Sequence, residues 1–186
     1  MSVISDPVAE LLARHRPRNP GEAADLDRSR QLAATAADPW LRTTPLHFTA
    51  SALVVHPASG RVLLRWHQRQ QAWLQVGGHG DPGESDPLEI ALREAREESA
   101  LTDLQPWPDA ELWQVTVVDV PASSKEPAHQ HADLRFILAT GDPDAARPET
   151  PGNPLRWLPV AEAETVTSEA NLRALLTRVG DLFARP

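Results

Sequence analysis

Three glutamates at helical spacing are the residues of this chain best able to do chemistry. Glu94, Glu97 and Glu98 stand at positions i, i+3 and i+4, which places their carboxylates on one face of a helix. Like charges at these spacings repel by roughly 0.2–0.5 kcal/mol per pair, and the helix macrodipole disfavours acids near a C-terminal end. A hard cation such as Mg²⁺ binds carboxylate oxygens and removes the repulsion. The pattern therefore indicates a metal site; the alternative is a solvated, charged helix face.

A glycine-rich loop leads into this acidic helix. Four glycines occur within residues 77–83, a composition that lets the backbone approach a ligand closely. Asp86 followed by Pro87 predicts an N-cap with proline at the first helical position. The apolar stripe of the helix would pack on a sheet, leaving the glutamates beside the loop. Phosphoanhydride cleavage needs this combination, because metal ions neutralise phosphate oxygens and a carboxylate positions water.

The stretch from Gly78 to Leu101 resembles the Nudix box, whose family pattern is G-x5-E-x7-R-E-U-x-E-E-x-G-U, with U a bulky apolar residue. The chain departs from the pattern at three points: eight residues rather than seven precede Arg93, Ala95 replaces a larger apolar residue, and Ala100 replaces glycine. We expect the extra residue to be absorbed at 85–87. A left-handed cap at Ala100 should cost about 1 kcal/mol more than at glycine or should not form. The matching residues are Gly78, Glu84, Arg93, Glu94, Glu97, Glu98 and Leu101.

The resemblance implies a Mg²⁺- or Mn²⁺-dependent pyrophosphohydrolase that acts on a small-molecule phosphoanhydride, a nucleoside diphosphate linked to another moiety. The metal ligands it implies are Glu94, Glu97 and Glu98, with the carbonyl of Gly78. Arg93 would orient a glutamate, and the catalytic residues would be Glu97, Glu98 and Arg93. The general base varies between members of the family; here we expect Glu97 or Glu98, with Asp142 and Glu149 as more distant candidates.

Further residues are candidates for contacts with the substrate. Glu84 supports the glycine loop and, by the resemblance, could reach a metal. His79 follows the two glycines, whereas His129, His131 and Asp133 precede a predicted strand. The last three could contact phosphate or a further metal, or they could be loop residues with ordinary hydrogen bonds. Three tryptophans could stack on a base or could pack in the core: Trp66, Trp73 and Trp113.

The chain divides into two predicted regions, a helical extension at 1–44 and a Nudix domain at 45–186. Asp6-Pro7 should begin one helix that ends near Pro17, and Asn19-Pro20 should begin another that runs to Asp38-Pro39. This extension could be a homodimerisation arm or a lid over the site, or it could pack against the domain edge.

The predicted domain is an α/β/α sandwich with a mixed sheet, as the resemblance implies. Residues 141–154 and Pro121 to Gln130 are proline-rich loops that could rim the site. A last helix should begin near Ser168 and be closed by Gly180. The strands are expected at 49–55, 61–66, 73–76, 112–120, 134–140 and 155–158.

Composition excludes several functional classes. The net charge of −8 argues against a broad nucleic-acid footprint, which requires clustered Lys and Arg. The sequence lacks cysteine, which excludes thiolate metal sites and disfavours an isomerase of isopentenyl diphosphate, whose relatives use a cysteine. No apolar run approaches a membrane span and no signal peptide is visible, so we expect a cytoplasmic protein. A non-hydrolytic nucleotide sensor on the same fold is the main alternative.

Overall fold

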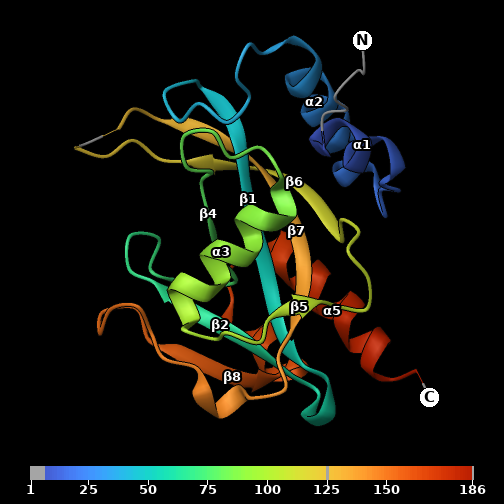
Figure 1. Cartoon of the computed structure of the whole chain (residues 1–186), viewed down its shortest axis with the longest axis vertical. Coiled ribbons are helices and arrows are strands. Elements are labelled where there is room, and N and C mark those ends of the chain that lie inside the picture. The colour runs from blue at the N-terminus through green and yellow to red at the C-terminus, as the bar shows by residue number, and fades with distance from the viewer. Residues whose placement is uncertain (1–6, 125, 186) are drawn as a thin grey trace.

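A mixed sheet of eight strands forms the centre of the computed structural model, which describes residues 7–124 and 126–185 (Figure 1). Helix α3 covers one face of the sheet and helix α5 covers the other. The elements are α1 (Pro7–Arg14), α2 (Pro20–Thr35), β1 (Leu46–His56), η1 (Pro57–Ser59), β2 (Arg61–His67), β3 (Ala72–Leu74), β4 (Val76–Gly78), α3 (Pro87–Ser99), β5 (Gln105–Pro106), β6 (Gln114–Val120), β7 (His129–Ala139), η2 (Pro143–Ala145), β8 (Leu155–Pro159), α4 (Val160–Val166) and α5 (Ala170–Phe183). This arrangement confirms the predicted sandwich with N-terminal helices.

The long parallel pair β1 and β7 sets the two faces of the sheet. Its register runs from Leu46 opposite Gln130 to Val55 opposite Ala139, and the other side of β1 pairs first with β4 and then with β2. Because side chains alternate between faces, the odd-numbered residues of both strands share the face toward α5. At the far end that face is apolar, but near the start of both strands it carries histidine, hydroxyl, carboxylate and guanidinium groups.

Helix α3 begins and ends where local sequence signals place it. The carboxylate of Asp86 accepts hydrogen bonds from the amides of Leu88 and Glu89, which satisfies donors that the first turn leaves free. Ala91 and Ala95 are fully buried on the sheet side. At the other end Ala100 adopts the left-handed conformation with φ of 58°. The cap therefore forms without glycine and carries the conformational cost expected of alanine.

The two N-terminal helices pack against the edge of the sheet. On α2, the Glu22 carboxylate accepts from the amide of Val115, and the Asp25 carboxylate accepts from the amide of Val117. These amides belong to β6, an edge strand whose unpaired donors would otherwise be open to another chain. The buried side chains of the helices join the core beneath α3: Val8, Leu11, Leu12 and Leu26.

The structure corrects three details of the sequence prediction. Strand β7 begins at His129 rather than 134, because β1 also extends and the two strands pair along their polar ends. Gly180 lies inside α5, which continues to Phe183, since the missing side chain leaves room for Val160 of the unpredicted helix α4. The predicted strand at 73–76 is divided between β3 and β4. Asp6, expected to cap the first helix, lies outside the described residues.

Within residues 7–124 and 126–185, no helix is long and apolar enough to cross a membrane.

Candidate active site

Arg93 is the centre of an ion-pair network on α3. Its Nε lies 3.0 Å from Glu84 Oε1, and its Nη1 lies 3.0 Å from both Glu94 Oε1 and Glu97 Oε2. Its Nη2 donates to the backbone carbonyl of His79 at 2.8 Å. Hydrogen bonds from Arg93 hold the pKa of Glu84 below its usual value. The additional residue before Arg93 therefore does not separate the loop from the helix.

Glu98 occupies a different and more buried position. Arg65 Nη1 lies 3.2 Å from Glu98 Oε1, and the amide of Gly77 donates to Glu98 Oε2 at 3.1 Å. Burial raises the pKa of Glu98 to about 7, although Arg65 and the Gly77 amide oppose that shift. Burial also raises the pKa of Glu94. Both carboxylates therefore lie where negative charge is costly and where a bound cation would stabilise it.

The glycine loop passes directly beside these carboxylates. A Cβ placed on Gly78 would lie 2.7 Å from the carboxyl carbon of Glu94, so an alanine there would displace the glutamate. Gly77 has a φ of 147° and faces the backbone of Ser51, a conformation that only glycine adopts readily. The site thus offers carboxylate oxygens next to closely approaching backbone, a donor set that fits a hard divalent cation.

A polar cavity of about 490 Å³ lies on the α5 side of the sheet. Arg65, Gly77 and Gly78 line it and also border the carboxylates of α3. The cavity wall contains Asp133, which accepts hydrogen bonds from Ser51 Oγ at 2.8 Å and from Arg135 Nε at 2.7 Å. The helix glutamates themselves do not line the cavity. Arg65, Gly77 and Gly78, which border both, instead connect the carboxylate cluster to the cavity.

Histidines gather at one end of this cavity. His79 and His131 line it, and the ring centroid of each lies close to that of His47, at 5.1 and 4.9 Å. Burial lowers the pKa of His79 to about 3 and that of His131 to about 4, so both rings are neutral at physiological pH. The sequence prediction missed His47, which the pairing of β1 with β7 places opposite His131.

Three predicted residues lie elsewhere or act indirectly. Trp73 packs edge-on against Trp66 beneath Arg156 and does not line the cavity. Asp142 immediately precedes the short 3₁₀ helix η2 and does not line the cavity. Glu149 is exposed, but its charge contributes to the raised pKa of Glu98. Its loop therefore approaches the buried carboxylate.

Comparison with known proteins decides the family. The family model described as the NUDIX domain matches residues 45–178. The chain belongs to the Nudix family. This confirms the family prediction from residues 78–101, and Nudix enzymes generally use divalent metal ions.

One curated relative is named a probable DHNTP pyrophosphohydrolase, from Lactococcus lactis subsp. cremoris (strain MG1363). The identity is 32% over 108 residues, which are 57% of this Nudix chain and 61% of the relative. The chain thus spans less than two thirds of the length of that relative.

Solved structures share the Nudix fold at lower sequence identity. A Caenorhabditis elegans Ap4A hydrolase in a binary complex has a TM-score of 0.59 at 20% identity, covering 74% of this chain and 97% of the other. A NUDIX-family hydrolase from Clostridium perfringens has a TM-score of 0.55 at 22% identity, with 73% and 97% covered. The Escherichia coli dihydroneopterin triphosphate pyrophosphohydrolase has a TM-score of 0.51 at 18% identity, with 73% and 94% covered. These likenesses establish the fold.

Proposed function

We propose that this Nudix protein is a Mg²⁺- or Mn²⁺-dependent pyrophosphohydrolase that cleaves a phosphoanhydride bond in a nucleoside diphosphate linked to another moiety. The observation that carries the proposal is the cluster of Glu94, Glu97 and Glu98 beside the backbone of the glycine loop. A divalent ion held by these oxygens and by the carbonyl of Gly78 would supply charge neutralisation at phosphate and a more acidic bound water. Three of the proteins named above, the two DHNTP or dihydroneopterin triphosphate pyrophosphohydrolases and the Ap4A hydrolase, are named for triphosphate or polyphosphate compounds, which supports the same class of bond.

Arg93 would position two of the carboxylates rather than act on the substrate. Its Nη1 contacts Glu94 and Glu97 together, while the Glu84 carboxylate and the carbonyl of His79 hold the other side of the guanidinium. This fixes both glutamates before any ligand binds, and preorganisation of that kind lowers the cost of reaching the reactive geometry. A lysine offers no planar fork and could not hold the same contacts.

Two carboxylates are candidates for the general base. Glu98 has a pKa of about 7 in the metal-free protein, which a bound cation would lower, and its side chain is almost fully buried. The Glu97 side chain is 53% exposed and is therefore easier for water to reach. Activity should fall as pH decreases through the pKa of whichever residue accepts the proton.

The cavity indicates a compact substrate. Its volume of about 490 Å³ lies in the range of small-molecule sites, and its polar wall suits hydroxyl and phosphate groups. His79, His131 and Asp133 line it and are proposed substrate contacts, whereas Trp73 would need to move to reach it. Homodimerisation and a cytoplasmic location remain predictions.

The test is a substrate screen with matched variants. Candidate compounds are nucleoside triphosphates, Ap4A, dihydroneopterin triphosphate, nucleotide sugars and dinucleotide cofactors, and released phosphate is distinguished from pyrophosphate. Glu97→Gln and Glu98→Gln should each lower kcat at least about 100-fold, the lower range for losing acid–base catalysis. Glu89→Gln is the control, because Glu89 is an exposed residue in the first turn of the same helix.

Two results would overturn the proposal. Turnover that survives both substitutions would show that the cluster does not carry the reaction. Tight nucleotide binding without turnover in either Mg²⁺ or Mn²⁺ would identify a non-hydrolytic sensor instead.

A further inference from the structure

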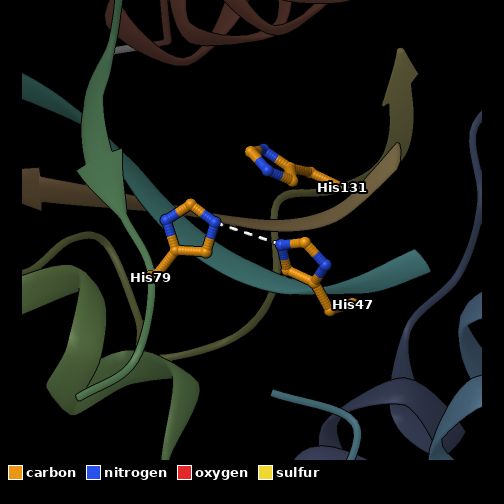
Figure 2. Close-up of side chains that lie close together, drawn as sticks. All are labelled: His47, His79 and His131. Carbon is orange, nitrogen blue, oxygen red and sulfur yellow. Dashed lines mark hydrogen bonds between the residues drawn. The ribbon is translucent and has the colours of Figure 1, made fainter. Parts of the chain in front are cut away.

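Three histidine rings from separate segments face a common space at the end of the sheet (Figure 2). His47 lies on β1, His131 lies opposite it on β7, and His79 follows β4. Each ring offers one nitrogen as a potential metal ligand. Among the described residues, these three ligand atoms all lie within 4.8 Å of one another. Nε2 of His47 lies 3.1 Å from Nε2 of His79.

Backbone carbonyls fix which nitrogen of two rings carries the proton. Nδ1 of His47 lies 2.9 Å from the carbonyl oxygen of Thr44. A carbonyl only accepts hydrogen bonds, so this Nδ1 donates, and Nε2 of the neutral ring turns a lone pair toward His79. His129 repeats the arrangement, with Nδ1 2.9 Å from the carbonyl of Pro127 and Nε2 3.1 Å from Nε2 of His131. Proteins orient metal-binding histidines in this way.

We propose that His47, His79 and His131 form a transition-metal site separate from the carboxylate cluster of α3. A tetrahedral ion with Zn–N bonds of about 2.0–2.1 Å separates its ligand nitrogens by roughly 3.3–3.4 Å. The distance of 3.1 Å between His47 and His79 is already close to that value, and the ligand atoms of all three rings lie within 4.8 Å of one another, so a bound ion would draw the third ring closer. Imidazole nitrogens select Zn²⁺, Co²⁺ or Ni²⁺ over Mg²⁺.

The position of the rings leaves the site accessible. His79 and His131 line the polar cavity, whereas His47 is fully buried behind them. The fourth coordination position therefore faces the cavity, where water or an anionic group could occupy it. A three-nitrogen site with one open position is the arrangement of a metal that exchanges ligands rather than of a closed structural centre.

The charges around the rings are paired with one another, although at His47 and His79 the effect of Arg42, which disfavours a cation, exceeds that of Glu126, which favours one. Arg42 and Glu126 both act electrostatically on His47 and His79, and they form an ion pair with each other at 3.4 Å. Asp133 favours positive charge at His131, and Arg135 pairs with that carboxylate at 2.7 Å. The charges facing the site are thus paired, and the rings themselves supply the affinity.

The test titrates Co²⁺ and Zn²⁺ into chelator-treated, untagged full-length protein in the presence of excess Mg²⁺, which occupies carboxylate sites. We expect one Co²⁺ per chain with the strong visible absorption of tetrahedral cobalt, displaced by Zn²⁺. His47→Gln and His131→Gln should each weaken Co²⁺ binding more than about 100-fold. Loss of an outer-shell partner alone costs up to about 100-fold in metal affinity, and loss of a direct ligand should cost more. His56→Gln is the matched control, because His56 lies at the other end of β1.

The outcomes separate this site from the catalytic cluster. Retained cobalt absorption in Glu97→Gln and Glu98→Gln supports the histidine site and does not depend on the proposed hydrolase activity. Cobalt that is lost in Glu98→Gln but kept in His47→Gln would place the ion on the carboxylates and overturn the proposal. Absence of bound Co²⁺ and Zn²⁺ in the wild type would also overturn it. Histidine ring signals of the wild type in NMR spectra, with and without Zn²⁺, give a readout that needs no variant.

Discussion

Metal binding to the carboxylate cluster should release a proton near pH 6 and almost none at pH 8. The pKa of Glu98 is raised to about 7 by burial, so the side chain is about 90% protonated at pH 6 and about 10% at pH 8. A divalent ion binds the ionised form. The apparent affinity should therefore be about tenfold weaker at pH 6 than at pH 8 through Glu98 alone.

Calorimetry in buffers of different ionisation enthalpy measures the number of protons released. We expect about 0.9 proton from Glu98 at pH 6 and about 0.1 at pH 8, and Glu98→Gln should remove this difference. Glu149→Gln is an informative control, because the charge of Glu149 contributes to the raised pKa. Its loss should move the proton release to lower pH. Equal proton release at both pH values, or an unchanged profile in Glu98→Gln, would refute the reasoning.

The same titration affects the stability of the metal-free protein. The folded-state pKa of Glu98 lies above its ordinary value of 4.5, so the folded chain holds the proton more tightly than the unfolded chain. The corresponding stabilisation is present below pH 4.5 and is lost as pH rises through about 7, a total change of about 3 kcal/mol. Urea unfolding with a chelator present should show this loss in the wild type, and Glu98→Gln should flatten it.

Three other substitutions give sharp expectations. Ala100→Gly should raise the free energy of unfolding by about 1 kcal/mol in chemical denaturation, because the left-handed conformation at φ of 58° no longer costs strain; no gain would show that the cap is unstrained. Gly78→Ala should lower turnover roughly 100-fold by displacing the Glu94 carboxylate, with near-native circular dichroism, and unimpaired turnover would contradict that geometry. Leu12→Ala should cost about 2–5 kcal/mol in one cooperative transition, since Leu12 is 1% exposed within the main core; a separate early transition would show that the helices fold apart from the domain.

The parts of the site that the sequence predicted depend on local signals. Asp86, Pro87 and the spacing of the glutamates lie within one short segment, and neighbouring residues alone determine the start and face of α3. The same segment supplies Arg93 and the Glu84 that anchors it. Ala100 marks a limit of such local reasoning. The helix adopts the left-handed cap there although glycine, the residue that favours this conformation, is absent.

The parts that the sequence did not predict depend on strand register. His47 and His131 are 84 positions apart in the chain, and the parallel pairing of β1 with β7 makes them neighbours. Arg65 on β2 meets Glu98 on α3 only through the tertiary fold, since the two residues are far apart in the chain. No local pattern contains that information, since a shift of one residue in either strand would turn its side chains to the other face.

The fold also explains how the two proposed sites, which differ in their chemistry, can lie so close together. The glycine loop passes between the faces of the sheet: Gly77 donates to Glu98 on the α3 side, and His79 turns its ring toward the cavity on the α5 side. The glutamate oxygens of α3 therefore lie on one side of this segment and the histidine nitrogens on the other, with Gly77 and His79 two positions apart in the chain. Because hard and borderline cations prefer different donors, such a loop can hold one ion on each side without direct competition. Saturating Mg²⁺ should then leave cobalt binding by the histidines unchanged.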